Sequence, residues 1–234
     1  VPAYLYVSSR SVYRAPVAAG ADEDAPIVDG SPDTGNGEYA ANKAGAEKAV
    51  LAAYGERALI ARAGLILGPY EDVGRLPWWL LRIARGGRVL APEPRDLPLQ
   101  YIDARDLAEW MLNCAERGVS GVFNAVSRPG HATMAELLEA CVAVTGAAAE
   151  LRWTPAETIL AQDVQPWIEL PIWLPPGEPF DRYGLHSGDV SKAYAAGLRC
   201  RPVRDTVADT WAWMQDIGRP PPLRDDLPPP GLDA

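Results

Sequence analysis

Residues 39–61 read YAANKAGAEKAVLAAYGERALIA and contain the helix and the strand that decide the fold. Tyr39–Tyr54 is rich in Ala, Lys and Glu, with no Pro and only Gly45, which predicts a helix. Ala58–Ala61 is a short apolar run that predicts a buried strand, and Tyr4–Val7 is a second such run upstream. Because strands separated by a helix tend to pair in parallel, this order indicates an α/β fold.

Local signals predict the remaining elements. Residues 14–38 carry acidic side chains without a periodic pattern, which favours an irregular functional loop or lid. Thr133 and Glu136 form a capping-box pattern at a helix start, and Gly146 is its expected stop. Helices are expected over 76–85, 106–116, 133–144 and 203–214, and a strand over 119–126.

Composition changes along the chain suggest three regions. Residues 1–150 hold most of the helix and strand signals. Residues 151–218 form a smaller region, and the prolines and tryptophans between 154 and 180 predict loops rather than regular elements there. Residues 219–234 contain two Pro-Pro-Pro runs, which predict an extended polyproline-type tail with little structural role.

Charge and composition exclude several classes of function. The formal net charge of −9 and the pI near 4.8 argue against unaided binding of nucleic acid. No apolar run approaches the roughly 20 residues of a membrane span. Cys114, Cys141 and Cys200 are widely spaced, and with only two histidines they offer no metal-ligand cluster. We therefore expect a cytoplasmic protein with reduced cysteines and without metal, nucleic acid or membrane partners.

Tyr39 and Lys43 form the pair that most directly indicates chemistry. Their i, i+4 spacing on a helix puts both side chains on one face. A free phenol has a pKa of about 10, and a nearby ammonium lowers that pKa by favouring the phenolate. The pair therefore suits proton transfer near neutral pH, and a surface helix pair without function is the alternative.

Three serines follow the first strand. Ser8, Ser9 and Ser11 fall beyond its carboxyl end, where parallel sheets bind ligands. A hydroxyl at this place can donate a hydrogen bond to a substrate carbonyl or alkoxide. The alternative is that these serines only cap the turn that follows the strand.

Six segments in order resemble a known family. The first ends a strand with Ser-Ser-x-x-Val-Tyr, the second is Tyr-x-x-x-Lys, and the third is Arg-x-Gly-x-x-x-Gly-Pro. The six lie at 7–13, 39–43, 62–69, 100–108, 123–137 and 189–198. Together they resemble the extended short-chain dehydrogenase/reductase superfamily, in its NAD-dependent epimerase/dehydratase branch. Ala63 departs from the usual Pro of the third motif, and 153–180 resembles bacterial reductases similar to isoflavone reductase.

This resemblance implies a fold and a set of roles. The implied fold is a Rossmann-type parallel sheet with flanking helices and a small carboxyl-terminal substrate region. Tyr39 would be the general acid–base, and Lys43 would lower its pKa and hold the nicotinamide ribose. Ser9 would polarise the substrate carbonyl or hydroxyl, with Ser8 or Ser11 as nearby alternatives. The other expected cofactor contacts are Ser8, Ala63, Gly64 and Leu65.

The resemblance also implies that a segment is missing. The Gly-rich dinucleotide fingerprint and the residue that selects NAD or NADP should precede these motifs, and the sequence contains neither. We therefore expect a chain without the N-terminal βα units of the domain. Its expected partners are NAD or NADP, a small-molecule substrate, and the missing half or another protomer.

The substrate is the least determined part of the prediction. Trp78 and Trp79 either line a substrate pocket or belong to the core. Because the substrate-side region has many Trp and Pro residues and few Arg residues for a diphosphate, we favour oxidation or reduction of a small organic substrate. Sugar-nucleotide epimerisation or dehydration is the first alternative. A non-catalytic scaffold or binding protein is the second, and the intact Ser9, Tyr39 and Lys43 set argues against it.

Overall fold

The computed structural model describes residues 3–35 and 37–232, which form two compact units. Unit 1 is assigned Val1–Ile66, Gln100–Pro129 and Asp181–Cys200. Unit 2 is assigned Leu67–Leu99, Gly130–Phe180 and Arg201–Ala234. Both units draw on residues from either side of position 150. The functional regions expected over 1–150, 151–218 and 219–234 stay a prediction.

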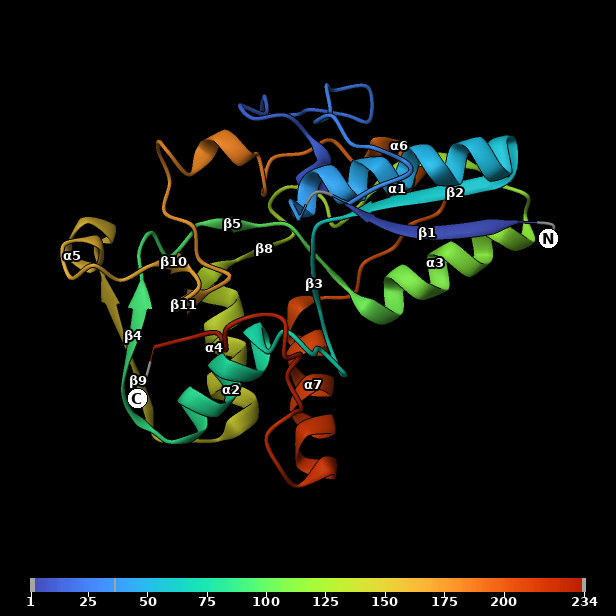
Figure 1. Ribbon diagram of the computed structural model, residues 1–234. Helices are drawn as coiled ribbons and strands as arrows, with labels where there is room; N and C mark the ends of the chain where they lie inside the picture. Colours follow the sequence, from blue (N-terminus) through green and yellow to red (C-terminus); the bar gives the residue numbers. More distant parts are fainter. Residues whose placement is uncertain (1–2, 36, 233–234) are drawn as a thin grey trace. The chain divides into compact units, whose positions relative to one another are not determined.

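The centre of unit 1 is a parallel sheet of order β1-β2-β7 (Figure 1). Its strands are β1 (Tyr4–Ser9), β2 (Ala58–Ala63) and β7 (Gly121–Ala125). Ser9 lies opposite Ala63, and Ala63 lies opposite Ala125, so all three strands end at one edge. The parallel pairing predicted from the strand–helix–strand order is confirmed.

Helices cover both faces of this sheet. α1 (Tyr39–Tyr54) lies on one face and α3 (Ala104–Glu116) on the other (Figure 1). Leu59 of β2 packs in the apolar cluster beneath α3, whereas Ile60 packs with Val50 of α1. A strand with two covered faces needs apolar residues at successive positions, which explains the apolar run Ala58–Ala61 at the start of β2.

Short elements and one long loop complete unit 1. The described residues of 14–38 are irregular, as predicted, except for a β-bridge between Tyr13 and Ile27. β3 pairs with β6. The short elements are η1 (Arg10–Val12), η2 (Gly55–Arg57), β3 (Leu65–Leu67), β6 (Tyr101–Asp103), η3 (Asp181–Tyr183) and α6 (Ser191–Ala195).

Unit 2 is built from helices and paired short strands. β4 pairs with β9 in parallel, β5 pairs with β8 in antiparallel fashion, and α4 packs against α2 and α7. Its elements are α2 (Arg75–Ala84), β4 (Gly87–Pro92), β5 (Pro98–Leu99), β8 (Ala132–Thr133), α4 (Met134–Thr145), β9 (Ala149–Thr154), α5 (Ala156–Leu160), β10 (Pro166–Trp167), β11 (Leu170–Pro171) and α7 (Val203–Ile217).

The start of α4 confirms the predicted capping box. The Thr133 side chain accepts a hydrogen bond from the Glu136 N–H at 3.2 Å, and the Glu136 carboxylate accepts one from the Thr133 N–H at 2.8 Å. Gly146 follows the helix with a φ of +61°, which favours glycine, and is the predicted stop.

Two predictions for unit 2 are wrong. Regular elements do form between 154 and 180: α5 begins directly after Pro155, a place where proline removes no helical hydrogen bond, and β10 and β11 form a short strand pair. The Pro-rich tail also has a structural role. The Arg224 N–H donates to the Asp72 carbonyl at 3.0 Å, because the non-proline residues of the tail keep their donors.

Glu71 caps the first turn of α2 and makes the stability of unit 2 depend on pH. Its carboxylate accepts hydrogen bonds from the N–H groups of Arg75 at 2.7 Å and Leu76 at 3.2 Å. Burial nevertheless raises the pKa of Glu71 from 4.5 to about 7. The folded state therefore binds this proton more tightly than the unfolded state does. The resulting stability is fully present below about pH 4.5 and is lost as the pH rises through about 7.

We predict that Glu71→Gln removes this pH dependence. From pH 4.5 to 8, the free energy of unfolding of the parent should fall relative to that of the variant by on the order of 3 kcal/mol. Urea unfolding at several pH values measures the difference. Other titrating groups, such as His186, are common to both proteins and cancel. A constant parent–variant difference across this range would contradict the prediction.

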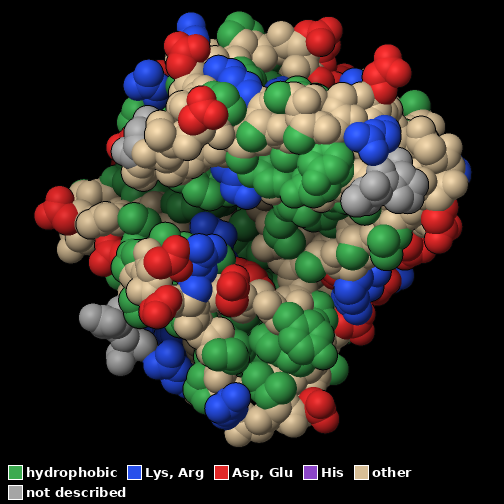
Figure 2. Space-filling model, turned by 45° about the vertical axis from the view of Figure 1, so that its right-hand side comes forward, with side chains coloured by type: hydrophobic (Ala, Val, Ile, Leu, Met, Phe, Trp, Pro, Cys, Tyr) green, Lys and Arg blue, Asp and Glu red, His purple; other side chains and the backbone are tan. Residues whose placement is uncertain are grey.

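The described residues were also compared with the requirements of a membrane span, a metal site and a basic surface patch. No helix among them is long and apolar enough to cross a membrane. Within 3–35 and 37–232, no group of three or more His, Cys, Asp or Glu side chains is arranged to hold a metal ion. On the face in Figure 2, acidic and basic side chains are interspersed rather than gathered in one basic patch.

Candidate active site

The carboxyl edge of the unit 1 sheet carries the serine segment. Ser9 is the last residue of β1 and is half-buried, and η1 follows it. The Ser9 hydroxyl oxygen accepts a hydrogen bond from the Ser11 N–H at 3.1 Å, which is the turn-capping arrangement considered above. Since accepting uses only a lone pair, the Ser9 O–H can still donate to a substrate oxygen. Ser11 itself is exposed.

Ser8 has different surroundings from Ser9. Its side chain is buried, and its hydroxyl donates to Glu47 Oε1 of α1 at 2.6 Å. The structure thus places Ser8 in the interior of unit 1, where it joins β1 to α1. Its expected cofactor contact stays a prediction.

Tyr39 and Lys43 lie on the first two turns of α1. Tyr39 is 60% exposed. Lys43 Nζ donates to the Val7 carbonyl at 3.0 Å and lies 5.9 Å from the Tyr39 ring centroid. It also lies 5.2 Å from the ring centroid of Tyr6 on β1. Lys43 therefore connects the start of α1 with the last part of β1.

Two glycines let the 14–38 loop pack directly on α1. A Cβ at Gly45 would lie 2.1 Å from the Ser31 carbonyl oxygen, and a Cβ at Gly30 would lie 2.2 Å from the Ala41 carbonyl oxygen. Only glycine permits backbones to approach this closely. Lys48 Nζ adds a hydrogen bond to the Gly30 carbonyl at 2.9 Å.

The Arg-x-Gly-x-x-x-Gly-Pro segment, residues 62–69, begins at the same edge of the sheet. Ala63 ends β2 opposite Ser9, and Leu65 begins β3. A Cβ at Gly64 would lie 2.8 Å from the Val126 side chain, so packing already requires glycine there. A nicotinamide contact at Ala63, Gly64 and Leu65 stays a prediction.

A buried polar network that was not predicted from the sequence lies next to this edge. Arg62 of β2 donates to Glu47 of α1, and its Nη1 donates to the Tyr13 hydroxyl at 3.2 Å. The Tyr13 hydroxyl donates to Asn124 Oδ1 at 2.7 Å. Burial raises the pKa of Tyr13, and the Arg62 hydrogen bond partly opposes that rise. The position of Glu47, one turn after Lys43, was the available signal.

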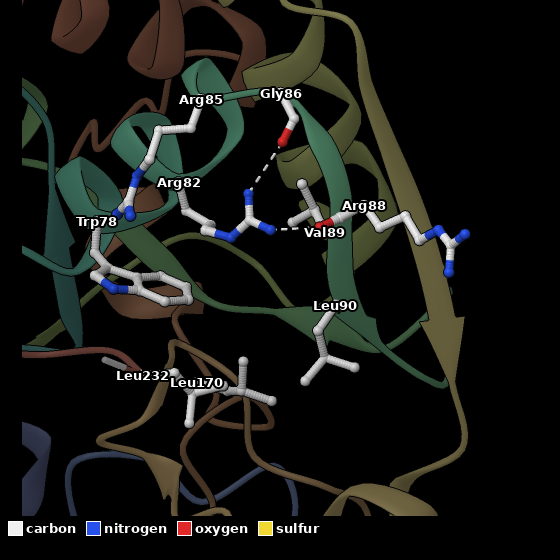
Figure 3. Close-up of a pocket in the computed structure, with 9 residues that line it drawn as sticks. All are labelled: Trp78, Arg82, Arg85, Gly86, Arg88, Val89, Leu90, Leu170 and Leu232. Atoms are coloured by element: carbon white, nitrogen blue, oxygen red, sulfur yellow. Dashed lines mark hydrogen bonds between the residues drawn. The ribbon is translucent and has the colours of Figure 1, made fainter. Parts of the chain in front are cut away.

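Trp78 and Trp79 of α2 have different environments within unit 2. Trp79 is fully buried, and its Nε1 donates to the Pro171 carbonyl at 2.8 Å, so it belongs to the core. Trp78 is half-buried and lines a pocket of about 520 Å³ (Figure 3). The structure therefore separates the two residues that the sequence left as equal candidates.

Arginine and leucine side chains surround Trp78 in this pocket. The guanidinium of Arg82 points to the Gly86 and Arg88 carbonyls, with Nη1 3.3 Å from the Gly86 oxygen (Figure 3). The Arg85 side chain extends toward Trp78, whereas the Arg88 side chain points away. The lining residues are Trp78, Arg82, Arg85, Gly86, Arg88, Val89, Leu90, Leu170 and Leu232.

A parallel sheet with helices on both faces places this unit in the class of open α/β folds, which bind ligands beyond the carboxyl ends of their strands. The family model of the NAD dependent epimerase/dehydratase family matches residues 1–125, which is more than half of the chain. The chain belongs to this family, and the predicted membership is confirmed. No curated protein matches the sequence.

Solved structures confirm the predicted α/β Rossmann-type fold. WbmG of Bordetella bronchiseptica, in complex with NAD and UDP, is similar with a TM-score of 0.63 and 18% identity over 98% of this chain and 65% of that chain. RMD of Pseudomonas aeruginosa, complexed with NADPH, has a TM-score of 0.61 and 19% identity, over 92% of this chain and 67% of that chain. The terminal R domain from the myxalamid PKS-NRPS biosynthetic pathway has a TM-score of 0.60 and 20% identity, over 92% of this chain and 58% of that chain. The chain thus spans about two thirds of the length of the first two.

Proposed function

We propose that this chain carries the proton-transfer site of an NAD(P)-dependent oxidoreductase acting on a carbonyl or hydroxyl of a small organic substrate. One observation carries the proposal: Lys43 Nζ lies 5.9 Å from the Tyr39 ring, beside the strand that ends in Ser9. Membership in an NAD-dependent family supports it. A cytoplasmic location, compatible with nicotinamide chemistry, stays a prediction.

Each of the three residues has a role that fits its surroundings. Tyr39 is exposed enough to reach a ligand, and its phenol gives a proton to a carbonyl oxygen or takes one from a hydroxyl. The Ser9 O–H donates a hydrogen bond to the same substrate oxygen. The Lys43 ammonium has three N–H donors and uses one on Val7, which leaves donors for the hydroxyls of a ribose.

The residues present fit the nicotinamide half of a dinucleotide. Tyr39 and Lys43 would hold its ribose, and the backbone of 63–65 would border the ring. When bound, the cofactor supplies or accepts the hydride. Within the described residues no Gly-rich turn joins a strand to a helix with the spacing that binds pyrophosphate, so the other half needs a further segment or another protomer.

Separate titrations with NADH and NADPH, followed by nicotinamide fluorescence, test the proposal. We expect weak or undetectable binding by this chain alone and clear binding by the longest polypeptide that the gene encodes. The structural reason is that the site residues hold only the ribose and nicotinamide. Failure of both polypeptides to bind either nucleotide would contradict the proposal and favour a non-catalytic scaffold protein.

A second candidate reaction is sugar-nucleotide epimerisation or dehydration. The low number of arginines in the substrate-side region of the sequence disfavoured this reaction. The structure instead brings Arg82 and Arg85 from α2 and its end to the Trp78 pocket of unit 2. Guanidinium groups beside an aromatic ring suit an anion with a planar base. Conversion of a UDP-sugar without net change in NADH absorbance would favour this candidate.

A further inference from the structure

We infer that Glu47 and Arg62 are positioning residues. Their buried ion pair holds α1 against the ends of β1 and β2, so that Tyr39 and Lys43 stay oriented toward the carboxyl edge of the sheet. The catalytic part of this inference rests on the proposed function. Neither residue is proposed to touch substrate or cofactor.

The pair has a fixed, two-pronged geometry. Arg62 Nε donates to Glu47 Oε1 at 3.0 Å, and Arg62 Nη2 donates to Glu47 Oε2 at 2.8 Å. Glu47 is 2% exposed and Arg62 is 5% exposed. A two-pronged guanidinium–carboxylate contact fixes direction as well as distance, because both groups are planar. It therefore limits both the rotation and the sliding of α1 relative to β2.

Further hydrogen bonds extend this restraint to every strand end at the edge. Glu47 also accepts from Ser8, the residue before Ser9. Arg62 Nη1 donates to the Tyr13 hydroxyl, which donates to Asn124 of β7. Arg62 Nη1 also donates to the Glu23 carbonyl in the long loop at 3.0 Å. The pair is thus the centre of a network that connects α1 with β1, β2, β7 and the loop.

The helix transmits the restraint to the proposed acid–base. Tyr39, Lys43 and Glu47 are spaced i, i+4, i+8 and so share one face of α1. Because an α-helix is stiff over two turns, fixing the orientation at Glu47 fixes it at Tyr39, about 12 Å away. A displacement of about 1 Å at a reacting group lowers the rate on the order of 10²-fold.

Stability alone is a poor explanation for a buried ion pair. The desolvation of two charges offsets much of their attraction, and apolar replacements of both partners are often neutral. Removing one partner alone is strongly destabilising, because it leaves the other charge buried. A test of positioning must therefore remove both charges together and compare stability with turnover.

The double variant Glu47→Gln/Arg62→Met meets this requirement. The introduced amide oxygen still accepts from Ser8, and the thioether fills the space of the Arg62 stem. We expect a melting temperature close to that of the parent, kcat lower by on the order of 10²-fold, and a KM that changes little. Unchanged kcat at unchanged melting temperature would overturn the inference.

A matched surface pair provides the control. Arg95 and Glu139 of unit 2 form an ion pair at 2.9 Å, with side chains 57% and 54% exposed. Glu139→Gln/Arg95→Met makes the same chemical changes where no site residue is connected. Its kcat should equal that of the parent, and an equal loss in both double variants would overturn the inference.

Amide hydrogen exchange separates this inference from the proposed function, because it needs no substrate. In the present chain, the Glu47→Gln/Arg62→Met variant should speed exchange of the amides at 42–46 by about tenfold, and the control should not. If the double variant fails to fold, Arg62→Lys keeps the charge but loses the two-pronged contact, and the same exchange is measured. Unchanged exchange in the folded variant overturns the inference even if the enzyme proves active.

Discussion

Tyr39→Phe is expected to lower kcat by about 10³-fold, within the range that general acid–base catalysis contributes. The variant lacks only the phenolic oxygen, so the ring keeps its place near Lys43, 5.9 Å from Nζ. No other described side chain is proposed to transfer this proton. Cofactor affinity should fall by no more than about tenfold, because one proposed ribose contact is lost while Lys43 and the backbone of 63–65 stay in place.

The measurement is steady-state turnover and NADPH affinity in the longest natural form of the polypeptide. Tyr70→Phe is the matched control, because Tyr70 is an exposed tyrosine of unit 2, 79% accessible, outside the proposed site. It should retain parental turnover. Parental turnover in Tyr39→Phe as well would refute the assignment of Tyr39 as the acid–base.

Trp79→Ala is expected to destabilise unit 2 by about 3–5 kcal/mol, the usual cost of emptying a large buried aromatic site. Trp79 is fully buried, and its Nε1 donates to the Pro171 carbonyl. The variant therefore loses apolar burial and leaves a carbonyl without its donor. A loss of this size is comparable with the total stability of many domains, so partial unfolding of unit 2 is expected.

Urea unfolding followed by circular dichroism measures this loss. Trp78→Ala is the matched control on the neighbouring position of α2, since Trp78 lines a pocket and is half-buried. We expect its cost to be clearly smaller, in line with less area removed from water. Equal destabilisation by the two variants would show that Trp78 also belongs to the core.

Trp78 and Trp79 illustrate what could not be predicted along the chain. Adjacent residues on a helix point about 100° apart, so one faced the core and the other did not. The sequence identified the pair but not which member was buried. The burial of Trp79 depends on the segment around Pro171, which lies 92 positions further along the chain. The short elements between 154 and 180 were missed for a similar reason, because local proline content outweighed pairing that only the fold supplies.

The sequence by itself determined the local features of this protein. The bounds of α1, the capping box at Thr133 and the shared face of Tyr39 and Lys43 all follow from contacts within four residues. Only the tertiary structure decided that Ser8 and Arg62 meet at Glu47, from 39 and 15 positions away. Helix periodicity depends on neighbouring residues, whereas the partner of a buried charge depends on which strands and helices pack together.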